Sequence, residues 1–247
     1  MNDIGYYILS ALAVLIILAI HEYAHGYVAY KLGDNTAKSY GRLTLNPIKH
    51  IDPVGTLCMI FFHVGWAKPV PINARNFKNP KSDFAKVALA GPLSNIIMGF
   101  VSAFVYLLIF AIFKDHKFNS EDFSFNLLQN ALLFIYLFHT INIGLGVFNL
   151  LPIPPFDGSR ILNVILPEKT YFRVMRHERK IYFAVLIWLL CGDTVASLIR
   201  TVPLVQNSTL LYNFAGVFSL SGMLATAIKF ISDLMMNFWQ LIPFLKV

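Results

Sequence analysis

The sequence contains little charge and almost no cysteine. Charged residues make up 13% of its 247 residues, whereas hydrophobic residues make up 57%. Soluble domains carry about 25% charged residues, so this composition is typical of a membrane protein. The two cysteines, Cys58 and Cys191, lie far apart in apolar stretches. They argue against a disulfide framework and against a zinc site built from cysteines.

Long apolar runs predict the fold class. Four runs are long enough to cross a bilayer, and a weaker fifth run follows them. They lie at about residues 4–30, 84–113, 127–151, 181–199 and, for the weaker one, within 209–245. Because the sequence has no internal repeat, we expect a single membrane-embedded domain over residues 1–247. Its fold class would be an all-α polytopic membrane protein, with a bundle of about four to five transmembrane helices.

The first and last apolar runs differ in what they predict. The N-terminus lacks the basic region and the cleavage site of a signal peptide, so we expect residues 4–30 to remain as a helix of the mature protein. Near the C-terminus, Lys229 and Asp233 interrupt the weaker run. Residues 209–245 are therefore compatible with a fifth span or with an interfacial helix.

The distribution of basic residues predicts the orientation in the membrane. The net charge is +7, but the lysines and arginines gather in short loops at 31–86 and 160–180. This pattern is typical of cytoplasmic loops and does not indicate a nucleic-acid partner. The connection at 114–126 has no positive excess. We expect a multi-pass protein of the cell membrane, with the two basic regions cytoplasmic and the connection and the N-terminus outside.

The stretch "AIHEYAHGYVAYKLGD", residues 19–34, places His21, Glu22 and His25 directly after an uncharged segment. On a helix, a step of four residues is about 400°, so the two imidazoles lie on one face. They can share one metal ion, for which zinc is the natural choice, with Glu22 as a general base. Ionisable groups in an apolar helix cost several kcal/mol and usually persist for function or pairing. The alternative is that the histidines pack against another helix while Glu22 pairs with a loop lysine.

A catalytic zinc site needs a third protein ligand, and Asp157 is the best candidate. It lies in "NLLPIPPFDGSR", residues 149–160, where three prolines break the third apolar run near its cytoplasmic end. With the expected orientation, this break lies at a depth similar to that of His21. The alternative for Asp157 is an ordinary Asp-Gly turn.

Five other residues compete with Asp157 for the ligand role. His139 is inside the third apolar run, where we expect it to pack between helices. His50 and His63 lie in the irregular region after the first run and could approach the site. We expect Asp52 and Glu168 to be loop charges.

The segment "VGTLCMIFFHVGWAKPVPI", residues 54–72, is too broken for an ordinary span. We expect a re-entrant loop or β-hairpin near the active site, shielded by protein or water. An edge strand at Trp66 to Ile72 could bind an extended substrate by strand addition. The alternative is a hairpin that only seals the site.

Three motifs in this order, "HEYAHG", "AGPLSN" and "NLLPIPPFDG", resemble those of the site-2 protease family of intramembrane metalloproteases. The resemblance covers about residues 16–165. It implies a metalloprotease domain with zinc bound by His21, His25 and Asp157, and Glu22 as the catalytic base. The sequence leaves no room for a PDZ or CBS domain, and in this it resembles the short type of the family.

Two asparagines are candidates for substrate binding. The resemblance suggests that Asn149 assists the substrate carbonyl or the oxyanion, whereas the alternative is a cap at the end of a helix. Asn95, in "AGPLSN", is a candidate of the same kind. Its alternative is a hydrogen bond across helices, with Gly91 and Pro92 allowing close packing at a helix start.

These residues favour an intramembrane zinc endopeptidase that cleaves transmembrane protein substrates in or near the bilayer, as in regulated intramembrane proteolysis. The alternative is a non-hydrolytic metal-binding membrane protein or a metal-ion transporter, which would have little use for a carboxylate between the two histidines. A soluble zinc peptidase with a membrane anchor does not fit, because the motif is inside the span. The sequence does not identify the substrate, the cleavage-site preference, the regulation or the oligomeric state.

Overall fold

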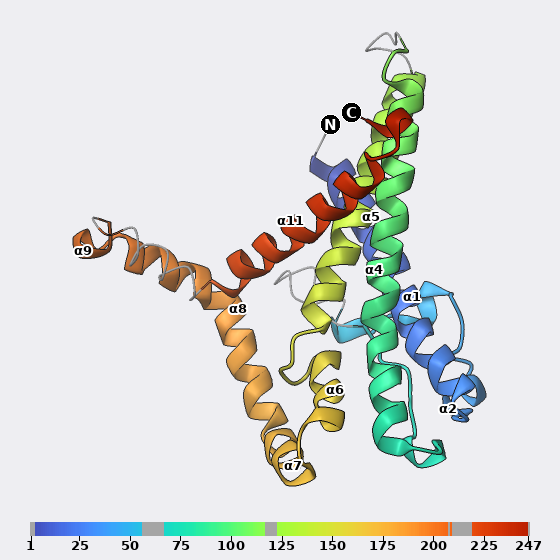
Figure 1. Ribbon diagram of the computed structural model, residues 1–247, viewed down its shortest axis with the longest axis vertical. Coiled ribbons are helices and arrows are strands. Elements are labelled where there is room, and N and C mark those ends of the chain that lie inside the picture. The colour runs from blue at the N-terminus through green and yellow to red at the C-terminus, as the bar shows by residue number, and fades with distance from the viewer. Residues whose placement is uncertain (1–2, 56–66, 117–122, 207, 209–218, 247) are drawn as a thin grey trace.

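The structure is a computed structural model that describes residues 3–55, 67–116, 123–206, 208 and 219–246 (Figure 1). Five helices of 20 residues or more make up most of it: α1 (Asp3–Lys31), α4 (Pro80–Phe113), α5 (Phe123–Asn149), α8 (Glu178–Arg200) and α11 (Leu220–Trp239). Shorter helices connect them: α2 (Thr36–Ser39), α6 (Asp157–Ile165), α7 (Glu168–Arg176), α9 (Pro203–Gln206) and the 3₁₀ turns Pro47–His50, Ala74–Asn76 and Pro243–Leu245. No strand is formed in these ranges, so the all-α class is confirmed there.

Three helices are long and apolar enough to cross a membrane, namely α1 from Ile4, α4 and α5. In α8, the parts Glu178–Leu189 and Cys191–Arg200 are bent by 50° and make a fourth span if they are counted as one. Within the described part of the chain, α11 does not pass the same test. The expected count of four to five spans is therefore not confirmed.

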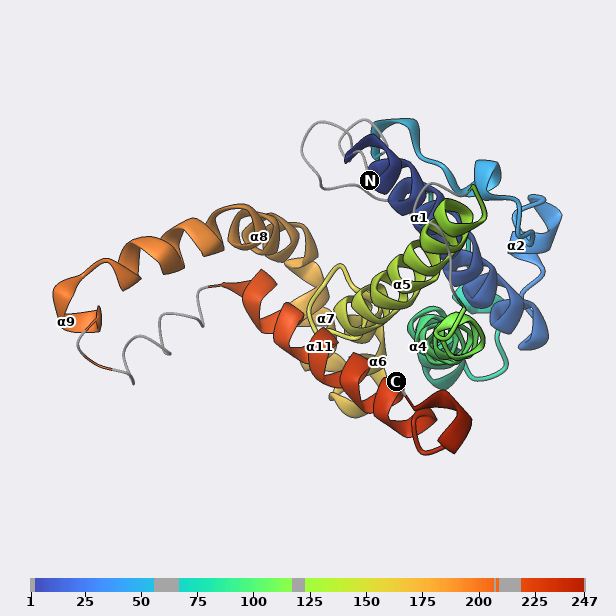
Figure 2. The same cartoon turned by 90° about the horizontal axis from the view of Figure 1, so that it is seen from above.

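Small residues bring α4 and α5 close together at the centre of the helical bundle (Figure 2). A Cβ atom added at Gly99 of α4 would lie 2.8 Å from Cγ1 of Ile143, and one added at Gly146 of α5 would lie 3.2 Å from the carbonyl oxygen of Pro92. Side chains at either position would separate the two backbones. Close packing on glycine is the usual way in which helices associate in a bilayer.

The outer face of α4 carries apolar side chains at four-residue spacing. Leu89, Leu93, Ile97 and Val101 are between 41% and 52% exposed. A four-residue step returns to nearly the same face of a helix, so these side chains form one stripe. A continuous exposed apolar stripe on a spanning helix is the surface that lipid chains cover.

The start of α4 differs from the sequence expectation. The apolar run begins near residue 84, and the alternative considered for Asn95 places Gly91 and Pro92 at a helix start, but the helix begins at Pro80 and continues through Pro92. Asp83 in the first turn accepts a hydrogen bond of 3.0 Å from the backbone N–H of Asn79 and thereby caps the helix. Proline at the first helical position and an acidic residue in the first turn both favour this earlier start.

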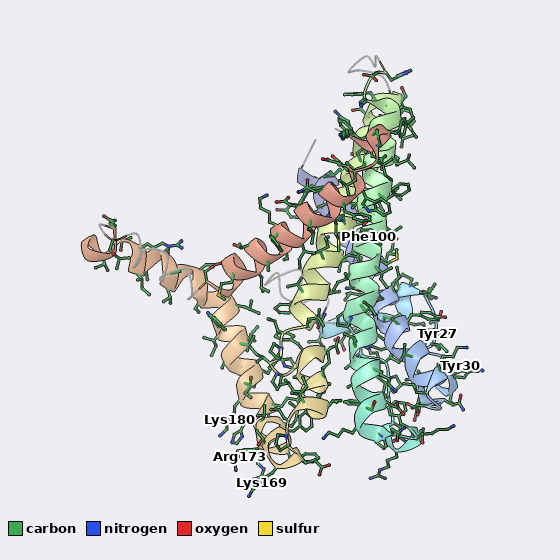
Figure 3. The ribbon with its side chains drawn as sticks, in the orientation of Figure 1. Tyr27, Tyr30, Phe100, Lys169, Arg173 and Lys180 are labelled. Atoms are coloured by element: carbon green, nitrogen blue, oxygen red, sulfur yellow. The ribbon has the colours of Figure 1, made fainter. Side chains whose placement is uncertain are left out.

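The helices α8 and α11 extend away from the bundle, and the start of α11 lies against the bent middle of α8, which continues beyond this contact to α9 (Figure 1). Asp193 of α8 accepts hydrogen bonds from the hydroxyls of Ser219 and Ser221 at the start of α11. At its other end α11 crosses α4, where the indole N–H of Trp239 donates to the carbonyl oxygen of Phe100 at 3.0 Å (Figure 3). The helices α8 and α11 thus form a V beside α5.

The ends of the segment expected to form a re-entrant loop or β-hairpin lie together. Ile51 and Ala67 form an isolated antiparallel bridge, and the N–H of Lys68 donates to the carbonyl oxygen of His50 at 2.9 Å. Residues 56–66, which include the centre of that segment, lie outside the described residues. The expected loop or hairpin is therefore not confirmed.

Candidate metal centre

The two histidines of α1 and Asp157 of α6 converge on one point. Oδ2 of Asp157 lies 3.2 Å from Nε2 of His21 and 3.2 Å from Nε2 of His25, and the two Nε2 atoms are 3.0 Å apart. Both histidines are buried. Among the described residues, these three form the one group of three or more histidine, cysteine or acidic side chains that could hold a metal ion.

The spacing of the three atoms fits zinc. Nitrogen and oxygen ligands that lie about 2.0–2.1 Å from a tetrahedral zinc ion are about 3.3 Å from one another. The separations of 3.0–3.2 Å among the three candidate ligand atoms are close to this value. Two imidazoles and a carboxylate also match the ligand types of catalytic zinc sites, which leave a further position open for water.

Hydrogen bonds on the far side of each imidazole ring fix its orientation. Nδ1 of His25 lies 2.7 Å from the carbonyl oxygen of Val87, which can only accept, so Nδ1 carries the proton. Nδ1 of His21 lies 3.3 Å from Oδ1 of Asn95 and donates to it in the same way. Both Nε2 lone pairs then point toward Asp157. A metal ion bound by these three electron-rich atoms would relieve their mutual repulsion, and such backing hydrogen bonds are typical of metal-bound histidines.

Gly91 of α4 lies against both imidazole rings. A Cβ atom at this position would overlap Nε2 of His25 and would lie 2.7 Å from Cε1 of His21. Real Cβ atoms do not approach other atoms this closely, so any side chain at residue 91 would displace the rings. The glycine of "AGPLSN" therefore lets α4 close one side of the centre.

Asp157 is the first residue of α6, which excludes the ordinary Asp-Gly turn considered from the sequence. The preceding loop folds back on itself, and a Cβ atom at Gly158 would lie 2.5 Å from the carbonyl oxygen of Leu151. Glycine is needed at 158 because the backbone is so close. Arg160, one turn further on, pairs with Glu178 of α8 at 2.7 Å and links α6 to that helix.

Glu22 lies beside the histidines and is held by backbone. Its Oε2 accepts a hydrogen bond of 2.8 Å from the N–H of Val70. Pro69 and Pro71 have no N–H, and Lys68 donates to His50, so the segment 67–72 has few donors left for strand addition. This arrangement favours the alternative in which the segment covers the site.

Two cavities meet at the centre, and His21, Glu22, Asn149 and Pro155 line both. The more polar one has a volume of about 240 Å³ and also borders His25 and Asp157. The other has a volume of about 280 Å³ and extends between α5 and α8. A larger groove, of about 760 Å³, lies between α5 and α11.

The two asparagines named from the sequence occupy different places. Asn149 ends α5 and donates from Nδ2 to the carbonyl oxygen of Leu145 at 3.1 Å, while it also lines both cavities. Asn95 is fully buried behind His21 and is not among the lining residues of either cavity. Its Nδ2 has no hydrogen-bond partner in the described part of the chain.

The competing ligands lie elsewhere or are not described. His139 packs between helices as expected, with Nδ1 donating to the carbonyl oxygen of Gly99 at 2.8 Å and Nε2 2.7 Å from the hydroxyl of Ser232. His50 is 2.8 Å from the carbonyl oxygen of Thr44 through Nε2. In the described ranges, neither joins the metal-binding group, nor do Asp52 and Glu168. His63 lies outside those ranges.

Sequence reasoning missed the residues that act through their backbone or through shape. The carbonyl oxygen of Val87 and the N–H of Val70 contact His25 and Glu22, but the side chains of these valines carry no signal of it. The pattern Pro69-Val70-Pro71 was a usable signal, because it leaves one N–H in a row of three residues. The contribution of α8 to the second cavity, through Tyr182 and Val185, had no sequence signal.

Comparisons with known proteins agree with the motifs. The model of "Peptidase family M50" matches residues 9–192. "Putative zinc metalloprotease YwhC" of Bacillus subtilis is 42% identical over 186 residues, which cover 72% of this chain and 80% of YwhC. "Zinc metalloprotease MJ0392" of Methanocaldococcus jannaschii is 28% identical over 68% of this chain and 38% of its own length. No solved structure matches the chain.

Proposed function

The chain belongs to peptidase family M50, the site-2 protease family, whose members use zinc, and we propose that it is an intramembrane endopeptidase. Its substrates would be transmembrane proteins, cleaved within or near their spanning segments. With its spanning helices the chain is a multi-pass membrane protein. The reaction would take place within the membrane, at the residues of the candidate metal centre.

One observation carries the proposal. The candidate ligands His21, His25 and Asp157 converge within 3.2 Å of one another at a site where two of them belong to a spanning helix. Glu22, on the same helix, lines both cavities that meet there. Hydrolysis inside a bilayer requires a metal site at membrane depth and, beside it, a carboxylate that does not bind the metal.

In this proposal the metal ligands, Glu22 and Val70 have separate roles. Zinc held by His21, His25 and Asp157 would supply Lewis-acid polarisation of the peptide carbonyl and make water acidic enough to attack at neutral pH. Glu22 takes the proton of the attacking water and then delivers it to the leaving nitrogen. The N–H of Val70 holds Oε2 of Glu22, which orients the carboxylate for both transfers.

The two asparagines would have different roles. Asn149 lines both cavities beside Glu22, where its carboxamide N–H can donate to the substrate carbonyl or to the oxyanion. Its present bond to Leu145 is within its own helix, so it can be exchanged for substrate. Asn95 is a positioning residue in this proposal, because its contact is with the far nitrogen of His21.

A route from the bilayer to the centre supports membrane substrates. The groove between α5 and α11 shares Leu145 and Phe148 with the cavity beside the candidate metal centre. A substrate helix in that groove must expose its backbone before cleavage, because the amides of an intact helix are bonded internally. The groove is therefore a docking place, and the cavity beyond it is where the chain would be extended.

The basic end of the molecule supports a cytoplasmic-side active site in the cell membrane. Lys169, Arg173 and Lys180 lie around α7, at the end of the molecule that also carries Tyr27 and Tyr30 of α1 (Figure 3). Tyrosines mark membrane interfaces, and lysines and arginines favour the cytoplasmic side. The centre at His21 is about two and a half helical turns from Tyr30, within the membrane but near this end.

Glu22→Gln tests the proposal. The amide cannot accept the water proton, so purified Glu22→Gln should hold about one zinc per chain, like the wild type, and cleave no membrane protein. Zinc is measured by mass spectrometry of the metal. Cleavage is measured by comparing membrane-protein fragments in cells that produce either variant. His21→Ala and His25→Ala should lose most of the zinc.

Glu168→Gln is the matched control, because Glu168 is an exposed residue of α7 and its substitution changes the same charge. It should keep both zinc and cleavage. Equal fragment patterns for wild type and Glu22→Gln, with zinc bound in both, would reject hydrolysis and favour a non-hydrolytic metal-binding protein.

A further inference from the structure

The cavity between α5 and α8 is apolar although it borders the candidate metal centre. It has a volume of about 280 Å³, and apart from His21, Glu22 and Asn149 its lining is mostly aliphatic and aromatic. Its apolar walls come from three helices and the loop before α6: Leu18, Leu145, Phe148, Phe156, Val185 and Leu189 among others.

The more polar cavity at the centre, of about 240 Å³, differs in its chemistry. It is lined by charged and polar groups that include His25, Asp157 and Arg160. Both cavities contain Glu22, so a peptide carbonyl beside Glu22 has an apolar space on one side and a polar space on the other. An extended peptide projects successive side chains to opposite faces, so it can offer a different residue to each space.

The apolar cavity is large enough for a phenylalanine side chain. A dry cavity of about 150 Å³ lined by leucine, isoleucine and phenylalanine already binds benzene. A space of about 280 Å³ is larger than this cavity, so it accepts a phenylalanine, leucine or methionine side chain. Burying such a side chain is worth about 1.5–3 kcal/mol, which is enough to select one residue type over alanine.

We propose that this cavity is the specificity subsite of the enzyme and that it binds a large apolar side chain next to the scissile bond. The inference rests on the proposed function, because it assumes that Glu22 and its neighbours act on a peptide. It assigns the selection to α8, whose Tyr182 and Val185 form the wall opposite α5. Val185 is 7% exposed, so its side chain faces the cavity and not the lipid.

An ion pair links α8 to the element that carries Asp157. Glu178 in its first turn pairs with Arg160, which lies one turn after the candidate ligand Asp157. The wall of the subsite is therefore tied to the element that carries that ligand. A side chain bound against Val185 would therefore lie beside the reacting carbonyl, as positional selection requires.

The test is the residue preference of the full chain with zinc bound. Purified protein in detergent is given a peptide library made from membrane proteins, and mass spectrometry of the new ends counts the residues on each side of every cleaved bond. For the wild type we expect one adjacent position to favour leucine, phenylalanine and methionine over alanine and glycine. Val185→Phe fills the cavity and should lower that ratio at least about tenfold, the equivalent of about 1.4 kcal/mol.

Ile187→Phe is the matched control, because it also introduces a phenylalanine on α8. Ile187 is 60% exposed, so the new side chain lies on the outer face of the helix. It should keep the wild-type preference. Tyr182→Ala enlarges the cavity and should raise the use of tryptophan at the same position, so the inference stays testable if Val185→Phe fails to fold. Cleavage that depends on Glu22 but keeps one preference in all three variants would overturn the subsite alone. Absence of Glu22-dependent cleavage by the zinc-loaded wild type would overturn the proposed function and the subsite with it.

Discussion

At the scale of single residues, Gly91 is the position where size matters most. Gly91→Ala would place a Cβ atom 2.6 Å from Cε1 of His25 and 2.7 Å from Cε1 of His21. The rings must turn away, and both candidate ligands move together. We expect the affinity for zinc to fall at least about tenfold, a loss that changes around metal ligands commonly cause. Competition with a chelator of known affinity measures it.

Gly144→Ala is the control for Gly91→Ala. Gly144 is also a helix glycine, but an added Cβ would meet only Cδ1 of Ile228, at 3.4 Å, among the described residues. Alanine in a helix is more stable than glycine by roughly 0.5–1 kcal/mol, so this variant should keep its zinc and unfold no earlier than wild type. Equal zinc affinity in both variants would contradict the position of α4 against the two rings.

The residue scale also shows how far the sequence alone could reach. The periodicity of a helix was enough to place His21 and His25 on one face, and three prolines were enough to mark the loop before Asp157. The contacts of Val87 and Val70 could not be predicted, because backbone groups are the same in every residue. Asn95 was named from its motif, but its place behind His21 depends on the packing of two helices.

At the scale of elements, the end of α1 is joined to the segment beside Glu22 through Asp34. Its carboxylate is buried and accepts hydrogen bonds of 2.7 Å from the N–H of Asn73 and from Nδ2 of Asn76, as well as one of 3.1 Å from the N–H of Thr36. Burial raises the pKa of Asp34, but a hydrogen bond from the hydroxyl of Thr36 and the three others lower it more, so its pKa lies below the ordinary value of 3.8. The carboxylate is stabilised in its charged form.

We predict that Asp34→Ala destabilises this region and changes its response to acid. The unpaired donors should cost about 1–3 kcal/mol of unfolding free energy. Because folding lowers the pKa of Asp34, its stabilisation is present above pH 3.8 and is lost as the pH falls through the lower folded value. Thermal unfolding between pH 3 and pH 7 should therefore show a smaller acid effect in Asp34→Ala than in wild type.

Asp233→Ala is the comparison for Asp34→Ala. Asp233 forms an exposed ion pair with Lys229 at 2.7 Å, and such pairs contribute about 0–1 kcal/mol. It should unfold close to wild type. If Asp34→Ala does the same, the hydrogen bonds of Asp34 do not stabilise the fold.

Element boundaries were predictable only where one cause determined them. The end of α5 at Asn149 follows from the prolines after it, and the structure has it there. The apolar run from residue 84 does not give the start of α4, because hydropathy marks where a helix becomes apolar, whereas Pro80 and Asp83 favour the earlier start. The 50° bend of α8 lies between Leu189 and Cys191, where the sequence has no proline and a single glycine, Gly192, follows.

At the scale of the whole molecule, the proposed orientation predicts which ends are accessible from outside. In a background with Cys58→Ser and Cys191→Ser, a cysteine at Asp115 should react with an impermeant thiol reagent in intact cells. A cysteine at Arg176 should react only after the membrane is opened, because the proposed orientation places the basic end on the cytoplasmic side. Both residues are exposed, so access to the reagent depends on the side of the membrane. Labelling of Arg176→Cys in intact cells would reverse the orientation and place the active site toward the outside.

The central claim is that α1 and α6, far apart in the sequence, hold one zinc ion together. Zinc-edge X-ray absorption of purified Asp157→Cys tests it most directly, because a zinc–sulfur distance of about 2.3 Å is easily distinguished from the shorter distances to nitrogen and oxygen. The comparison uses a background with Cys58→Ser, in which we predict no sulfur contribution while Asp157 is present, because Cys191 is exposed and is not part of the candidate centre in the described ranges. In Asp157→Cys we predict one sulfur beside two imidazoles. A spectrum of Asp157→Cys with zinc bound but without sulfur would contradict the claim.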